Sequence, residues 1–216
     1  MLNKYNVILF DLDGTIADTD RMIIESFNQL YDLYRNGNRT KEEQIIYFSG
    51  PSIFDTMKKE FPNVDTNLMV DRFREISTKI YPKTVKLYPG TLKMLEALKK
   101  GGYRLGIVTN KVHHASEYCL SLLNIRSYFD TLICFDDVKE GKPSPEGILK
   151  AIEELKEKDL NKVLYIGDNA IDLLSADNAK VDCALLYWGP RVLSPSLNPK
   201  YKLNNFEELT RLLIDE

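Results

Sequence analysis

The sequence is poor in cysteine: Cys119, Cys134 and Cys183 are the three in 216 residues, with no spacing typical of a metal site or disulfide framework. Long apolar runs are also missing, since none approaches the ~18 residues of a membrane-spanning helix. The first residues do not resemble a signal peptide, and the net charge of −3 comes without a basic tail or charge block. We therefore expect a cytoplasmic protein, a monomer or weak homodimer, that binds neither nucleic acid nor a membrane.

The apolar residues that are present gather in short continuous runs, which is typical of strands covered on both faces. Five runs have this character: Tyr5–Phe10, Arg104–Thr109, Thr131–Phe135, Val163–Ile166 and Asp182–Tyr187. Helical patterns separate most of them, at Thr91–Lys100, Val112–Leu123 and Pro145–Lys158. Alternation of strand and helix predicts an α/β fold with a doubly wound parallel sheet.

One interval is too long for a single crossover, because more than ninety residues separate Phe10 from Arg104. Its patterns are helical throughout, at Thr19–Tyr34, near Lys41–Tyr47, at Ser52–Phe61 and at Asn67–Tyr81. We predict an inserted all-helical domain over residues 18–84, with the α/β core formed by 1–17 and 85–216. Asp18 and Asp20 are expected to cap its first helix.

The predicted strands end in polar residues, and in parallel α/β sheets ligands bind beyond these carboxyl ends. The first strand ends in "ILFDLDGT", whose two acids at i and i+2 can face one site. The later strand ends and loops supply Thr109, Asn110, Lys142, Asp168 and Asp172. The sequence thus predicts four acids, a hydroxyl and a lysine at one edge of the sheet.

Four acids at one site repel each other unless a cation is present. Oxygen ligands without His or Cys favour Mg²⁺, which in turn favours a phosphate oxygen as a further ligand. Lys142 and Thr109 would then bind the same phosphoryl group, with Asn110 beside them. One carboxylate can attack phosphorus to form an aspartyl phosphate, and the second can act as acid and base. We predict a small phosphorylated metabolite as the substrate.

These residues resemble the haloacid dehalogenase superfamily of phosphohydrolases. "DLDGT", "VTN", "KPSPEG" and "GDNAID" are similar to its four motifs, so the resemblance covers nearly the whole chain. "YPGTLKMLEALKKGGYRLGIVTNK" and the "WG…EEL" run are similar to the phosphoglycolate phosphatase branch. The inserted helices resemble that branch's small cap domain, and "FSGPSIFDTM" resembles the cap loop of phosphoglycolate phosphatases and pyrophosphate-hydrolysing relatives.

The resemblance implies a Rossmann-like core and assigns roles to the strand-end residues. It implies Asp11 as nucleophile, Asp13 as acid/base, Thr109 as a phosphoryl ligand and Lys142 as the residue that stabilises charge. The implied Mg²⁺ ligands are Asp11, Asp13 (through its carbonyl), Asp168 and, in support, Asp172. Together these imply a Mg²⁺-dependent phosphatase acting on phosphoglycolate-like phosphomonoesters or pyrophosphate.

Two regions are less clearly defined by the resemblance. The segment after the fourth motif has Ala176 and Lys180 where relatives often carry Gly, so its backbone must avoid φ > 0 or tolerate strain. In the insert, residues Ser49, Gly50, Pro51 and Ser52 are the candidate substrate-contacting loop, because Gly and Pro fix its shape and leave N–H groups for an anion. The alternative is a plain turn between helices.

Two other functions use similar residues. A phosphosugar mutase of the β-phosphoglucomutase type would share the site and the cap, although Thr15 stands where such mutases often carry Val. A receiver-like phosphoacceptor module would also place Asp, Thr and Lys at strand ends with Mg²⁺. A receiver-like module needs neither the insert nor Asp13. The presence of Asp13 also argues against two other classes of enzyme, dehalogenases and phosphonate hydrolases. The sequence does not identify the substrate.

Overall fold

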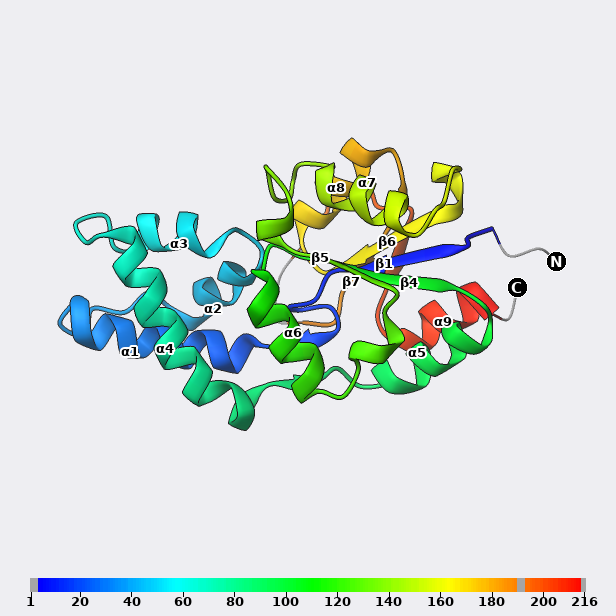
Figure 1. The fold of residues 1–216 in the computed structure, drawn as a ribbon. Coiled ribbons are helices and arrows are strands. Elements are labelled where there is room, and N and C mark those ends of the chain that lie inside the picture. Colours follow the sequence, from blue (N-terminus) through cyan, green and yellow to red (C-terminus); the bar gives the residue numbers. More distant parts are fainter. Residues whose placement is uncertain (1–3, 190–192, 215–216) are drawn as a thin grey trace.

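The computed structural model describes residues 4–189 and 193–214 and is built around a six-stranded parallel sheet (Figure 1). Its strand order is β5-β4-β1-β6-β7-β8, and every neighbouring pair is parallel. The strands are β1 (Val7–Phe10), β4 (Arg104–Val108), β5 (Thr131–Ile133), β6 (Val163–Gly167), β7 (Asp182–Leu186) and β8 (Tyr201–Leu203). The predicted α/β fold with a doubly wound parallel sheet is confirmed.

Helices cover both faces of this sheet, which explains why its strands are apolar without alternation. α7 (Glu146–Glu154) and α8 (Ala170–Ala179) lie on one face, and α5 (Thr91–Lys100), α6 (His113–Leu122) and α9 (Phe206–Ile214) on the other (Figure 1). Successive residues of β1 contribute to different cores: Ile8 and Phe10 to one, Val7 and Leu9 to the other. All four are fully buried, so β1 holds the strand-end acids on a rigid element.

The insert between β1 and β4 is helical, as its sequence pattern predicts. It contains α1 (Asp20–Tyr34), α2 (Glu42–Ile45), the 3₁₀ helix η1 (Ile46–Ser49), α3 (Ile53–Glu60) and α4 (Thr66–Thr84). These helices lie beyond the carboxyl ends of the strands (Figure 1). Aromatic side chains pack inside the insert, with the ring of Phe27 4.8 Å from Phe48 and 5.5 Å from Phe73. The domain boundary itself stays a prediction.

Two short strands join the insert to the core and were not predicted. β2 (Ala17–Asp18) pairs antiparallel with β3 (Lys86–Leu87), where the chain leaves and re-enters the core. Asp18 is therefore a strand residue, and its carboxylate lies 3.5 Å from Lys86. Thr19 occupies the N-cap position of α1, without a side-chain cap bond, and Asp20 is the first helical residue. The expectation that Asp18 caps this helix is wrong, because strand pairing uses it instead.

Other differences lie at element ends. The predicted helix to Lys158 ends at Glu154, and the following Lys156 has φ of 55°. The segment with Lys180 in place of Gly does adopt a left-handed conformation, with φ of 61° after the end of α8. Of the helices in the described ranges, none combines the length and apolarity needed to cross a bilayer.

Candidate active site

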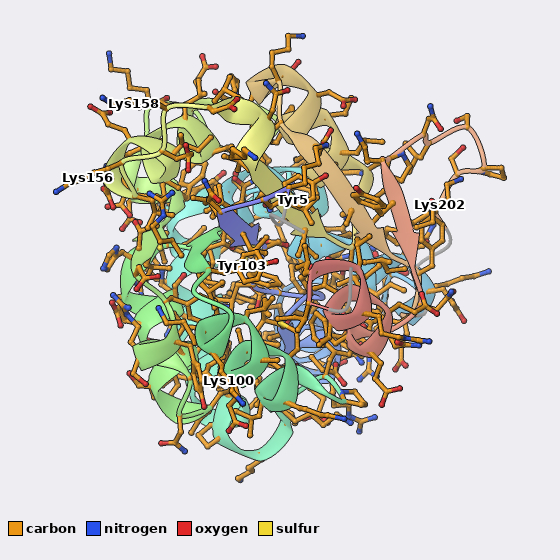
Figure 2. All side chains as sticks on the ribbon, turned by 90° about the vertical axis from the view of Figure 1, so that its right-hand side faces the viewer. Tyr5, Lys100, Tyr103, Lys156, Lys158 and Lys202 are labelled. Carbon is orange, nitrogen blue, oxygen red and sulfur yellow. The ribbon has the colours of Figure 1, made fainter. Side chains whose placement is uncertain are left out.

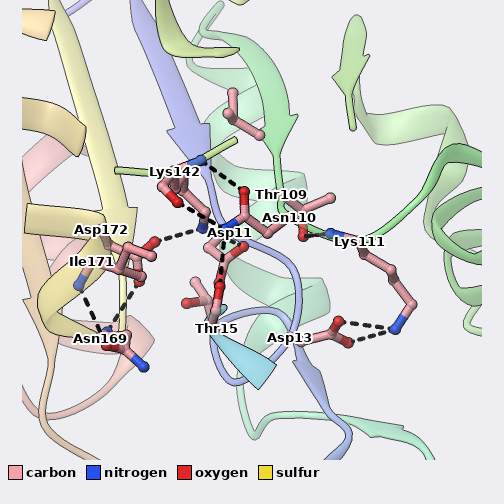
Figure 3. A network of polar contacts seen from close by, with 12 residues as sticks. Asp11, Asp13, Thr15, Thr109, Asn110, Lys111, Lys142, Asn169, Ile171 and Asp172 are labelled. Atoms are coloured by element: carbon pink, nitrogen blue, oxygen red, sulfur yellow. Dashed lines mark hydrogen bonds and ion pairs between the residues drawn. The ribbon is translucent and has the colours of Figure 1, made fainter. Parts of the chain in front are cut away.

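The predicted site residues meet at the carboxyl ends of the strands (Figure 3). Asp11 and Asp13 follow β1, Thr109 and Asn110 follow β4, Lys142 lies in the loop after β5, and Asp168 and Asp172 follow β6. All seven are buried. At the opposite end of the sheet, Figure 2 shows lysines such as Lys100 and Lys158 pointing outward, where they are exposed. The burial of Lys142 is therefore a feature of this edge.

Lys142 bridges two of the carboxylates. Its Nζ lies 2.8 Å from Asp11 Oδ1 and 2.6 Å from Asp172 Oδ1, and it donates to the Tyr165 hydroxyl at 3.1 Å. Burial alone lowers the pKa of this ammonium, but the charges of Asp11 and Asp172 outweigh it and hold the pKa above its usual value. Lys142 is thus a fixed cation beside Asp11.

At Asp11, the effect of burial on the pKa outweighs that of the neighbouring lysine. Burial raises the pKa of its carboxyl to about 7, although Lys142 opposes the shift and Asp172 adds to it. A carboxylate stripped of water and held by one ammonium keeps a lone pair available for attack on an electrophile. The structure places this oxygen at the end of a buried strand, where its orientation is fixed.

Asp172 has all its polar contacts inside the protein. Its Oδ2 accepts hydrogen bonds from the backbone N–H groups of Asp168 at 3.2 Å and Asn169 at 3.0 Å, closing a capping box at the start of α8. Its Oδ1 faces Lys142 and the Tyr165 hydroxyl. These contacts make Asp172 the group that positions Lys142.

Asp168 lies against the loop that follows β1. The Thr15 hydroxyl donates to Asp168 Oδ1 at 3.1 Å. Gly14, with φ of +88°, packs so closely that an added Cβ would overlap the Asp168 carboxylate. Only glycine allows both this backbone conformation and this approach. The Gly of "DLDGT" therefore brings the backbone after Asp13 into contact with Asp168.

The site has the charge and the donor atoms that a divalent cation requires. Asp11, Asp168 and Asp172 each place a carboxylate oxygen within 4.8 Å of the others. When all are ionised, the four aspartates (with Asp13) against Lys111 and Lys142 leave a net charge of −2, four negative minus two positive. Hard oxygen donors with uncompensated charge fit Mg²⁺.

Lys111 is a site residue that the sequence analysis missed. Its Nζ lies 3.0 and 2.9 Å from the two carboxylate oxygens of Asp13, and Figure 3 shows Asp13 turned toward it. Burial lowers the pKa of Lys111, but Asp13 outweighs it and the net shift is upward. The available signal was its place directly after "VTN", since a residue next to a strand-end pair reaches the same edge.

Asn110 connects the core to the inserted helices. Its Oδ1 accepts from the Lys142 N–H at 2.7 Å, and its Nδ2 donates to the carbonyls of Lys142 at 3.1 Å and Gly50 at 3.0 Å. The Thr109 hydroxyl accepts from the Lys111 N–H at 3.2 Å. Asn110 therefore fixes the backbone of the lysine loop and also holds the insert against the strand ends.

The four predicted residues of the cap loop lie in different surroundings. Gly50 packs on the core, where an added Cβ would lie 2.7 Å from Asn169 Nδ2. Ser49 and Pro51 line a cavity between insert and core. The Ser52 hydroxyl accepts from the Asp55 N–H at 3.2 Å and so caps α3. Ser52 thus caps a helix, whereas the other three residues of the loop face the core.

Gly167→Ala is expected to disturb the site by displacing the Asp172 side chain. A methyl group at this position would overlap the Asp172 carboxylate, which positions Lys142. Displacing a buried ion pair should lower the free energy of unfolding by ~1–3 kcal/mol and reduce kcat. Chemical denaturation and steady-state kinetics measure both. Gly101→Ala, at the end of α5, is the control, and equal effects from the two variants would contradict the predicted role of Gly167.

The comparisons with known proteins agree with this geometry. The sequence model of the family described as haloacid dehalogenase-like hydrolase matches residues 8–186. Pyrophosphatase PpaX of Bacillus mycoides is 33% identical over 213 residues, 97% of each chain. The chain belongs to the haloacid dehalogenase-like hydrolase family. The predicted family and its hydrolase character are thereby confirmed.

Solved structures share the fold across nearly the whole chain. A Bacteroides fragilis protein described as a haloacid dehalogenase-like hydrolase is 28% identical with a TM-score of 0.83, covering 95% of this chain and 100% of that one. A Clostridium difficile protein described as a phosphatase is 27% identical with a TM-score of 0.79, covering 98% and 99%. The inserted helices are therefore part of the shared architecture.

Proposed function

We propose that this hydrolase is a Mg²⁺-dependent phosphatase that transfers the phosphoryl group of a small phosphorylated metabolite to Asp11 and then to water. The observation that carries the proposal is that the two buried acids are each paired with a different lysine. Asp11 lies 2.8 Å from Lys142, while Asp13 is held 2.9 Å from Lys111. One acid is thus available as nucleophile and the other as a proton carrier.

In the first step, a carboxylate oxygen of Asp11 attacks phosphorus and the bond from phosphorus to the leaving oxygen breaks. Lys142 and the Thr109 hydroxyl stabilise the charge on the phosphoryl oxygens. Asp13, protonated for this step, gives its proton to the leaving oxygen. In the second step, Asp13 takes a proton from water, which attacks phosphorus and releases phosphate and the Asp11 carboxylate.

Bound Mg²⁺ would neutralise charge on the phosphoryl group and on the acids around it. The residues that would hold it are Asp11, Asp168 and the backbone carbonyl of Asp13. Asp172 supports this arrangement through Lys142, because its own oxygens accept from protein donors.

The inserted helices form, in this proposal, a cap that excludes water during the transfer to Asp11. The hydrogen bond from Asn110 to the Gly50 carbonyl supports a closed position. The paired strands β2 and β3 supply the connection around which the insert would move. Relatives named pyrophosphatases indicate that small phosphorylated molecules, pyrophosphate among them, are the first to test. Release of inorganic phosphate rather than an isomerised sugar phosphate distinguishes this function from a mutase.

Metal removal tests the proposal in solution. Excess EDTA is expected to abolish phosphate release, and added Mg²⁺ to restore it. Ca²⁺ should not replace Mg²⁺, since it takes more ligands at longer distances and would disturb in-line attack. A colorimetric phosphate assay across the three conditions measures this. Undiminished phosphate release in excess EDTA would show that the acids serve another purpose.

A further inference from the structure

A cavity of about 320 Å³ lies between the inserted helices and the core. Asp13 and Asn110 form part of its wall, so it opens onto the proposed reaction site. Most of the remaining wall is apolar, with Phe27, Phe48 and Phe73 from the insert and Tyr118 from α6. At ~30 Å³ per molecule, its volume corresponds to roughly ten waters.

The lysine and the arginine on this wall are each paired with a carboxylate while Asp13 is ionised. Both oxygens of Asp13 are engaged by Lys111, and Arg74 lies 3.2 Å from Asp71. Protonation of Asp13 for the transfer would free Lys111, and Arg74 lies in an exposed ion pair, so a second phosphate group placed here would gain few cationic partners against a largely apolar wall. Moving an anion into apolar surroundings without pairing costs several kcal/mol. The cavity therefore suits an apolar leaving group better than the second half of pyrophosphate.

An aromatic ring suits the same surroundings. Rings 4.8 to 5.5 Å apart already line the insert side, and edge-to-face packing is favourable at these separations. The apolar wall continues to Asp13, which would protonate the leaving oxygen. A substrate bound with its phosphoryl group at Asp11 would extend its leaving group past Asp13 into the cavity.

We propose that the leaving group of the substrate carries an aromatic ring or an apolar body of that size, and that it binds in this cavity. The preferred substrate is then the phosphomonoester of an aromatic-bodied alcohol, not pyrophosphate or phosphoglycolate. This inference rests on the proposed phosphatase function. It adds no chemical step, because the products are the free alcohol and inorganic phosphate.

The test compares kcat/KM in Mg²⁺ for 2-phenylethyl phosphate, ethyl phosphate and pyrophosphate. Both esters release primary alcohols, so their leaving oxygens have similar acidity and the ring is the main difference. The ring should raise kcat/KM at least ~10-fold over ethyl phosphate, the range that apolar pocket contacts give. Pyrophosphate should be the poorest substrate of the three.

A variant tests whether the cavity is responsible for this preference. Ala115→Phe, on α6, adds a ring at the cavity wall and should lower the ratio of the two esters' kcat/KM ~10-fold. Ala97→Phe, on α5 and outside the cavity lining, is the matched control and should leave the ratio as it is. Thermal unfolding checks that both variants are folded, and the wild-type comparison stands without them.

The outcomes separate the inference from the proposed function. Ethyl phosphate or pyrophosphate turned over as well as 2-phenylethyl phosphate would overturn the aromatic preference while leaving a phosphatase. An unchanged ratio in Ala115→Phe would show that the cavity does not hold the ring. Absence of phosphate release from every compound in Mg²⁺ would overturn the proposed function and the inference with it.

Discussion

Asp11→Asn is expected to lower kcat at least ~10³-fold, the scale of removing a catalytic nucleophile. The amide that replaces the carboxylate is a poor nucleophile and cannot carry the phosphoryl group. Asn has nearly the same size, and it removes a charge that is costly at this site, where burial raises the pKa of the carboxyl to about 7. The fold should therefore survive, and phosphate release measured at saturating substrate reports the chemical step.

The control is Asp32→Asn, an exposed aspartate of α1 paired with Arg39 at 2.7 Å. It removes the same charge from the insert and should leave kcat within about twofold, because exposed ion pairs contribute little. Near-wild-type kcat in Asp11→Asn with an intact fold would exclude Asp11 as the nucleophile.

Lys142→Met is expected to remove both activity and a large part of the stability. The lysine compensates two buried carboxylates, at 2.8 Å from Asp11 and 2.6 Å from Asp172. Breaking a buried ion pair by removing one partner costs ~3–5 kcal/mol of unfolding free energy. Methionine fills most of the volume, so the cost arises from charge. Urea denaturation measures the stability, and phosphate release measures the activity.

A double-mutant cycle separates the two effects. Adding Asp172→Asn to Lys142→Met removes one of the uncompensated charges and should recover part of the lost stability. It should recover no activity, since the cation beside Asp11 is still absent. Additive losses of stability would show that Lys142 and Asp172 do not interact, and recovered turnover would show that Lys142 has no role in stabilising charge.

The sequence predicts that the candidate site residues lie together, because one physical rule determines where strands end. Strands of a parallel sheet place their carboxyl ends at one edge, so the sequence alone predicts that Asp11, Asp168 and Asn110 lie close together. The burial pattern of β1 follows from the same reasoning, since a continuous apolar run needs two covered faces. These predictions depend on local sequence and sheet topology alone.

The direction in which a side chain points is harder to predict from the sequence. Lys111 follows a predicted strand, but its long side chain could reach solvent as easily as Asp13. The predicted place of Asp172 near the metal stays a prediction, with its carboxylate within 4.8 Å of Asp11 and Asp168, but its contact with Lys142 is not apparent from the sequence. Short pairings such as β2 with β3 contain too few residues to give a sequence pattern, which is why the sequence predicts a helix cap at Asp18.

The measurement that tests the central claim most directly is trapping of the phosphorylated enzyme. In Asp13→Asn the nucleophile remains while hydrolysis of the intermediate slows, so phosphate should accumulate on the protein. Reaction with an activated aryl phosphate in Mg²⁺, borohydride reduction and peptide mass spectrometry then locate it. We predict that position 11 is converted to homoserine. A phosphoryl group on another residue, or continued turnover with no trapped protein, would contradict the mechanism.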